Sequence, residues 1–464
     1  MRRRPLFLAL LTLYSCAAIA QESQTQADFR GEATRFKQSC EDFSLKKLSG
    51  CAELLFTDHP LHIAVGSIAP QNGFGAGGAY VGHYTPNELW RTSWDADAIA
   101  SDNGSWRAGF YYKAIHTPIE KIKVVTATSG PPTHSNLSVH SSTVFNLTAQ
   151  SISLNQLFFY GLGPNSLKAN ASVFGMTETI TGGNAIVPLG HSLNASLLGE
   201  ANGRFVNLRG NHSESSPSIE QLFTETTAPG LTTQPDVAQF GEGIRLEPAL
   251  FNDHWQIDYL AQFKQYVAPS DGNYTFRRLN FDLDNTIPLY RNSASYGPRL
   301  TNGPDDCAAA LGATKCSAIQ RNREGSVEVR LFITESMASA GSIVPFYYQP
   351  TIGGSDINGN SWLPSYSDYR FRAPNALVLR EAFEHSIWGP IGFVFSADQG
   401  KVALVRNDVD FSQLAHSFSV GLTLRAGGLP ALSLSFAWGG PEGTHTIANV
   451  NTSLLGGSAR PSLF

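Results

Sequence analysis

Three arginines and two acids between residues 370 and 398 are the side chains best placed to form a polar site. They are Arg370, Arg372, Arg380, Glu384 and Asp398. Arginine and carboxylate groups make strong, directional ion pairs. Such a group could hold a loop in place or line an aqueous path. A purely structural ion-pair network in a water-filled interior is the alternative, and the sequence leaves it open.

Strand periodicity explains why these charges would face the same way. Successive side chains of a strand point to opposite faces of the sheet. One face of two consecutive expected strands is apolar, with Leu377, Leu379 and Phe383 on the first and Ile391, Phe393 and Phe395 on the second. An arginine at mid-depth in hydrocarbon costs about 2–4 kcal/mol. The charged residues are therefore expected to face the interior.

No spacing in the sequence matches a catalytic or metal-binding motif. It has neither a Gly-x-Ser-x-Gly elbow nor a His-Glu-x-x-His pair, although His59 and His62 lie close together. Gly161 and Gly163 lack the strand-to-helix context of a phosphate loop, so they are expected to permit a close backbone approach. We therefore expect no catalytic residue, metal or cofactor. An enzyme whose triad is assembled across barrel strands remains an alternative.

The cysteines and the first residues indicate export. Arg2 to Arg4, the apolar Leu6 to Leu13 and the final Ala18-Ile19-Ala20 predict a signal peptide over residues 1–20. Cleavage before Cys16, as in a lipoprotein, is the alternative. In an oxidising compartment, two disulfides are expected at the close pairs Cys40 with Cys51 and Cys307 with Cys316.

Composition and periodicity together indicate an all-β transmembrane barrel. Charged residues are 15%, aromatic residues 11%, glycines number 43 and mean hydropathy is -0.13. No later run has the roughly 18–20 apolar residues of a membrane helix. Alternation as in Ala431 to Trp438 recurs from about Phe74 to Leu455, which predicts an antiparallel barrel of about sixteen strands. The net charge of -5 gives no reason to expect nucleic acid as a partner.

The connections support the same prediction. Short turns are expected at 268–273, 338–341 and 388–390, and a long surface loop at 291–325, which carries Cys307 and Cys316. Short turns at one end and long loops at the other are typical of outer-membrane barrels. We divide the chain into a periplasmic lead-in, 21–72, and a barrel, 73–464. A large soluble β-sandwich or propeller is the alternative, and no repeat of 40–50 residues supports a propeller.

Three segments resemble the Omp85 superfamily, also called the bacterial surface antigen D15 family. Phe158 to Ser166 is similar to its aromatic-Gly-Leu-Gly-Asn segment. Tyr369 to Arg372 is similar to the residues after its long sixth loop, and Phe393 to Val402 to its Phe-x-Asp-x-Gly strand with one residue added. The resemblance implies a barrel whose sixth loop folds into the lumen.

The departures from that family pattern matter as much. The family's Arg-Gly-aromatic tip corresponds here to Leu363, Pro364, Ser365 and Tyr366, which lacks the arginine. Asp398 would then need Arg370 or Arg372 as its partner. The lead-in is too short for the POTRA domains that precede many of these barrels.

The resemblance implies a monomeric protein of the bacterial outer membrane, with lipid around it and the loop from Asp356 to Asp368 occluding its lumen. Its expected role is membrane assembly or the translocation of protein or solute, with substrate proteins or periplasmic proteins as partners and no enzymatic activity. A passive pore or a structural surface barrel is the alternative.

Overall fold

The computed structural model describes residues 61–87, 89–117, 142–190, 194–211, 216–251, 254–296, 319–388, 391–426, 429–450 and 461–463, together with Thr34. The predicted signal peptide and the four cysteines of the two predicted disulfides lie outside these residues, as does most of the predicted lead-in.

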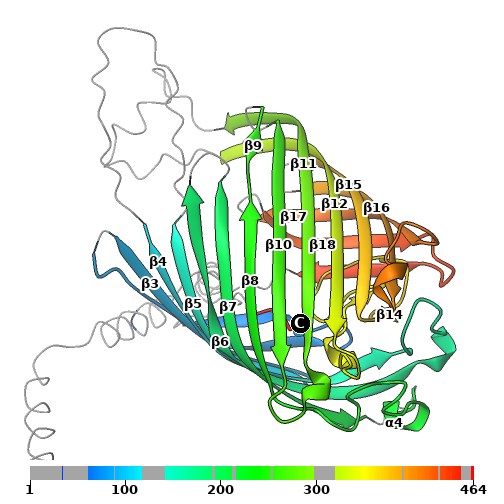
Figure 1. Ribbon diagram of the computed structural model, residues 1–464. Helices are drawn as coiled ribbons and strands as arrows, with labels where there is room; N and C mark the ends of the chain where they lie inside the picture. Colours follow the sequence, from blue (N-terminus) through cyan, green and yellow to red (C-terminus); the bar gives the residue numbers. More distant parts are fainter. Residues whose placement is uncertain are drawn as a thin grey trace, which may run out of the picture.

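In the described residues, one antiparallel sheet of sixteen strands forms the barrel wall, as predicted, and each of its strands pairs with the next along the chain. β8 and β9 count as one strand because both pair with β10. Figure 1 shows this sheet curled into a barrel. The strands are β1 (Leu61–Ser67), β2 (Phe74–Tyr84), β3 (Trp90–Ser101), β4 (Trp106–His116), β5 (Thr143–Phe159), β6 (Ser172–Gly190), β7 (Ala195–Gly210), β8 (Val237–Leu246), β9 (Ala249–Leu250), β10 (Trp255–Val267), β11 (Phe276–Tyr296), β12 (Ile319–Ala338), β15 (Asn375–Trp388), β16 (Ile391–Ala403), β17 (Ala415–Ala426), β18 (Leu429–Trp438) and β19 (His445–Val450).

In the described ranges from residue 61 onward, helices are few and short. They are α4 (Ile219–Leu222) and the 3-10 turns η1 (Lys168–Asn170), η2 (Gly272–Tyr274), η3 (Phe346–Tyr348) and η4 (Arg406–Asp408). No helix in the described part of the chain is long and apolar enough to cross a bilayer.

The first strand begins earlier than the sequence analysis predicted. β1 starts at Leu61, inside the expected lead-in, and pairs along its length with β2. Its apolar alternation covers only Leu61, Ile63 and Val65 before Gly66 and a turn, which is too short a pattern to recognise. The predicted end near Leu455 lies outside the described residues, and β19 is described to Val450.

Antiparallel order fixes the end of the barrel at which each connection lies. Residues 339–374, between β12 and β15, define what we call the plug end. Residues 160–171, 268–275 and 439–444 join strands at this end, and residues 297–318 and 389–390 join strands at the opposite end. The predicted asymmetry was therefore wrong in detail: the turn at 388–390 shares its end with the long connection, and the turns at 268–273 and 338–341 do not.

Two of the predicted boundaries also change. The chain turns at Gly341 but does not return directly, because it runs on to β14 before β15 begins. Much of the predicted loop 291–325 is strand, since β11 continues to Tyr296 and β12 starts at Ile319.

The two faces of the sheet have the polarity of a membrane barrel. Large apolar side chains are exposed on the outer face, among them Leu147, Phe205, Phe240, Leu422, Leu434 and Phe436. Inward positions of the same strands carry buried polar residues such as Gln150, Arg204 and Gln239. A sheet that spans a bilayer has apolar side chains on its outer face and polar side chains on its inner face.

The plug-end half of the lumen contains a packed core. Phe346 of η3 lies in the lumen with its ring centroid 5.0 Å from that of Phe159 on β5 and 5.2 Å from that of Phe174 on β6. Tyr266 and Phe276 stack at 4.4 Å on the wall formed by β10 and β11. These rings are buried, so this half of the barrel is filled with side chains.

Candidate functional site

A hairpin inside the lumen forms the centre of the site. Its arms are β13 (Thr351–Ile352) and β14 (Phe371–Arg372), which pair with each other, and we call residues 351–372 the plug. Leu363 is fully buried, and Trp362 and Tyr366 are each 4% exposed. The structure therefore places the loop from Asp356 to Asp368 in the lumen, as expected.

Asp398 anchors the plug to the barrel wall. Its carboxylate accepts hydrogen bonds from Arg380 Nε at 2.7 Å and Nη2 at 2.6 Å, and from the backbone N–H of Leu363 at 2.9 Å. Arg380 faces Asp398 directly in the β15–β16 ladder. The prediction that Asp398 pairs with Arg370 or Arg372 was wrong, because the neighbouring strand already supplies the cation.

Trp362, next to Leu363 in the plug, lies between two arginines of the barrel wall. Its ring lies 4.6 Å from the guanidinium of Arg380 and 5.1 Å from that of Arg330 on β12. Arg330 is itself held by both carboxylate oxygens of Asp282, at 2.8 and 2.7 Å. An aromatic ring between two cations makes favourable cation–π contacts. Trp362 of the plug therefore contacts two arginines of the barrel wall. No sequence pattern had indicated a role for Trp362, Arg330 or Asp282.

The remaining tip residues bind the next strands along the sheet. The backbone N–H of Ser365 donates to Ser417 Oγ at 2.8 Å, and the N–H of Gly440 donates to Ser365 Oγ at 3.0 Å. Leu363 has φ of 51°, a left-handed conformation unusual for leucine. Contacts with β16, β17 and the β18–β19 connection therefore hold the tip in a bent conformation.

Arg370 and Arg372 belong to the plug and not to the inner face of a barrel strand. Strand β15 starts only at Asn375, after Pro374. Arg370 pairs with Glu442 in the connection between β18 and β19, and donates to Ser166 Oγ at 2.9 Å. The predicted cluster therefore divides into separate groups.

The last two residues of the predicted cluster, Arg372 and Glu384, also lie apart from each other. Arg372 donates to the carbonyl of Phe346 at 2.8 Å, and burial lowers its pKa to about 10. Glu384 lies on the inner face of β15 as predicted, opposite Ser326 and further from the plug than Arg380.

The three segments that carried the family resemblance meet at the plug. Gly163 of the first has φ of 92° and donates its N–H to the carbonyl of Arg372 in the second at 2.8 Å. Asp398 of the third binds the tip. Gly163 thus permits a close backbone approach, as predicted.

A tight turn forms the far end of the plug. The buried carboxylate of Asp356 accepts hydrogen bonds from the backbone N–H groups of Asn358 at 2.9 Å and Asn360 at 2.8 Å. Burial raises the pKa of Asp356 to about 6.

This pKa predicts a pH dependence. Between about pH 4 and pH 6 the folded state keeps a proton on Asp356 that the unfolded chain loses, so stability falls as pH rises through this window and levels off above it. Asp356→Asn is expected to remove this contribution. Urea unfolding in vesicles, followed by tryptophan fluorescence at pH 4, 5, 6 and 7, measures it. The same fall in both proteins would contradict the assignment.

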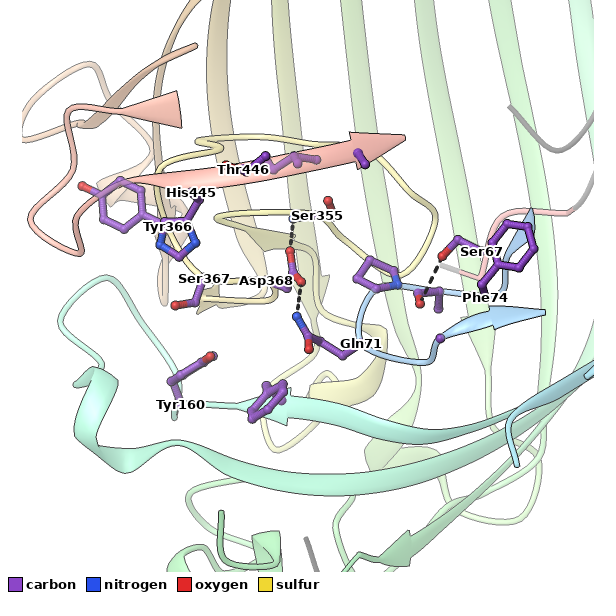
Figure 2. A pocket seen from close by; sticks show the side chains of 16 residues that line it. Ser67, Gln71, Phe74, Tyr160, Ser355, Tyr366, Ser367, Asp368, His445 and Thr446 are labelled. Carbon is purple, nitrogen blue, oxygen red and sulfur yellow. Dashed lines mark hydrogen bonds between the residues drawn. The ribbon is translucent and has the colours of Figure 1, made fainter. Parts of the chain in front are cut away.

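A cavity of about 770 Å³ lies beside the plug, where the first and last strands approach each other. Figure 2 shows Asp368 accepting from Gln71 Nε2 at 2.6 Å and from the N–H of Ser355 at 2.8 Å. The lining comes from β1, β2, β19, the plug and the end of β5, and includes Ser67, Phe74, Tyr160, Tyr366, His445 and Thr446. In the described residues no ladder joins β1 to β19, so we call this junction the seam.

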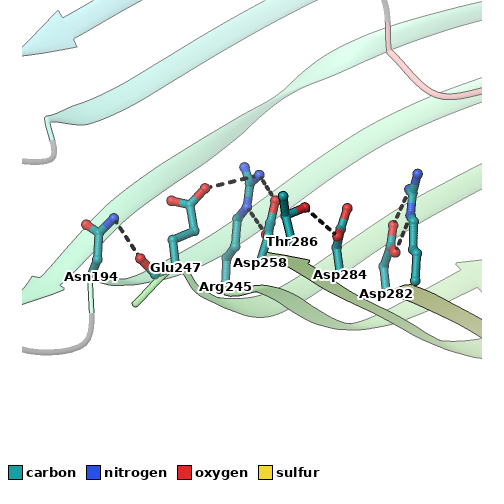
Figure 3. A network of polar contacts seen from close by, with 8 residues as sticks. Asn194, Arg245, Glu247, Asp258, Asp282, Asp284 and Thr286 are labelled. Carbon is teal, nitrogen blue, oxygen red and sulfur yellow. Dashed lines mark hydrogen bonds and ion pairs between the residues drawn. The ribbon is translucent and has the colours of Figure 1, made fainter. Parts of the chain in front are cut away.

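Towards the opposite end, charged side chains line the wall. Figure 3 shows Arg245 between Asp258, with 2.8 Å from Nε to Oδ1, and Glu247 at 3.1 Å. The side chains of Arg245 and Asp258 are 41% and 43% exposed, so this row is in contact with water. Nowhere in the described ranges do three His, Cys, Asp or Glu side chains gather as a metal site would require.

Comparison with known proteins finds solved structures that resemble this chain, but no similar sequence. No protein-family model matches the sequence, and no curated protein sequence is significantly similar to it. Similar solved structures include BamA from Haemophilus ducreyi lacking POTRA domains 1-3, with 10% identity over 84% of this chain and 69% of that chain and a TM-score of 0.45. CdiB from Acinetobacter baumannii has 11% identity and a TM-score of 0.45, and CdiB from Escherichia coli 12% and 0.47. Each match covers 84% of this chain, and 59% and 62% of the respective CdiB chains.

At 10 to 12% identity the likeness concerns the fold, and the activity has to be argued from this chain's own residues.

Proposed function

We propose that this chain is an Omp85-type protein of the bacterial outer membrane that inserts or translocates polypeptides and has no enzymatic activity. The observation that supports the proposal is the seam: among the described residues, β1 and β19 face a cavity with no ladder between them, while the plug fills the lumen beside them.

The physics of strand edges favours a polypeptide as the cargo. An unpaired edge presents a row of backbone N–H and C=O groups that another strand can pair with. In lipid these groups cannot be left unpaired at low cost. The edges of β1 and β19 can therefore accept an incoming strand, and the polar side chains of the cavity can accompany it.

A passive pore is the second candidate, and the hydrated charges around Arg245 favour it. The packed core and the plug oppose it, because together they fill the plug-end half of the lumen. Steady conductance of the intact protein would support the pore.

Locking the seam tests the proposal. Ser67→Cys and Thr446→Cys place thiols on β1 and β19 at the cavity, where a short bismaleimide can join them. Vesicles that contain the protein are expected to accelerate folding of a urea-denatured eight-stranded outer-membrane barrel, followed by its heat-modifiable gel mobility. The crosslink is expected to abolish the acceleration.

The control lock joins strands that already pair. Ala76→Cys and Ala100→Cys are register partners on β2 and β3, so their crosslink should change nothing. No acceleration by the unlocked protein, or equal acceleration after seam locking, would overturn the proposal.

A further inference from the structure

Residues 461–463 lie in the lumen and form no strand of the sheet. The last described strand, β19, ends at Val450 at the opposite end of the barrel. Leu463 is nevertheless 5% exposed and belongs to the core cluster around Phe346 at the plug end. Residues 461–463 therefore lie at the plug end of the lumen, although β19 ends at the opposite end.

Two hydrogen bonds to described residues of the wall and the plug hold this segment through its backbone. The carbonyl of Ser462 accepts from Arg204 Nη2 at 2.8 Å, and the N–H of Leu463 donates to Asn358 Oδ1 at 2.8 Å. Arg204 belongs to the β7 wall, and Asn358 to the turn of the plug. The segment thus bridges the wall and the plug.

The wall side of this bridge is rigid. Arg204 is buried and pairs with Glu178 Oε1 at 2.8 Å, and its Nε donates to Gln239. These contacts orient the guanidinium and leave Nη2 for the carbonyl of Ser462. A buried, preorganised donor of this kind holds a backbone acceptor firmly.

The plug side depends on the segment. The tip from Leu363 to Ser367 is held by Asp398, Ser417 and Glu442. The hydrogen bonds that start in the turn 356–360 stay within the plug, except the one between Asn358 and Leu463, as far as the chain is described. That contact is therefore the turn's polar connection to the β7 side of the barrel.

We propose that residues 461–463 act as an internal latch that keeps the turn of the plug seated in the lumen. When the latch is released, the turn of the plug is free to move while the tip stays anchored at Asp398. Movement of the turn opens a path along the β5–β8 wall. The latch concerns closure of the lumen. Its tests are independent of the test for polypeptide insertion at the seam.

Cysteine labelling tests the docking of the segment. Leu463→Cys keeps the backbone N–H, and in the otherwise unchanged protein its reaction with a membrane-impermeant maleimide is expected to be slow. Adding Asn358→Ala removes the acceptor and is expected to raise the labelling rate roughly 5- to 10-fold, the effect of losing about one hydrogen bond. Asn273→Ala, an exposed asparagine in another plug-end connection, is the matched control and should leave the rate unchanged.

Planar-bilayer recordings test the consequence. Asn358→Ala is expected to convert a silent protein into one with frequent openings, and Asn273→Ala is not. Heat-modifiable gel mobility shows which variants are folded, and Asn358→Ala removes only a side chain at a turn. Fast labelling in the parent background, or unchanged labelling and conductance in Asn358→Ala, would overturn the latch.

Discussion

Asp398→Ala is expected to destabilise the protein by about 3–5 kcal/mol and to release the tip of the plug. The carboxylate is fully buried and binds both Arg380 and the N–H of Leu363. Its removal leaves a largely buried guanidinium without a counter-charge and a backbone donor without an acceptor. Both losses act on the same few residues, so the tip should detach as a unit.

Urea unfolding in vesicles measures the stability, and protease sensitivity of the plug measures the release. The double variant Arg380→Met with Asp398→Leu removes both charges and should cost less than the single change. Asp410→Asn, which alters an exposed pair with Lys401, should leave both readouts unchanged. A stable Asp398→Ala protein with a protected plug would show that the core alone seats the tip.

Deletion of residues 354–368 is expected to turn a silent barrel into one with large, persistent conductance. The deleted residues include the tip and Trp362, which pack with residues of β15 and β16, and the turn at Asp356, whose neighbour Ile357 packs against the core on β5 and β6. The charged row at Arg245 would then line a continuous aqueous path. Planar-bilayer recordings of the refolded protein measure the change.

A second deletion at the same end of the barrel is the control. Residues 407–412 lie in the exposed connection between β16 and β17, and their removal should leave the protein silent. Equal conductance before and after deletion of the plug would mean that it does not close the lumen. A barrel that conducts while intact would favour the passive pore.

The barrel could be predicted because its signal is local. Alternation within one strand reports which face meets lipid, and Leu432, Leu434 and Phe436 are exposed as that pattern requires. β1 was missed for the same reason, since three alternating residues before Gly66 carry too little signal. The turn at 388–390 was misassigned because a single strand, β15, separates it from the connection that begins at 339, which places the two at opposite ends of the barrel.

The site could be predicted only in part. Asp398 and the tip were recognised from family segments, and Arg380 from its parity on β15. The pairing of Asp398 with Arg380 depends on the register between two strands, which periodicity does not fix. Contacts such as Gln71 with Asp368, 297 residues apart, arise only when the barrel is assembled. Neither Trp362 nor the latch had a local pattern to reveal it.

The chain-order pairing of the strands has a consequence for how the barrel folds. Among the described residues, every ladder of the barrel joins strands consecutive in the chain, so each hairpin can form by closing a comparatively short loop. Only the meeting of β1 with β19 requires the two extremes of the sheet to find each other, and loop-closure entropy makes that step the most costly. The seam should therefore be the last junction to form during folding and the first to part on heating.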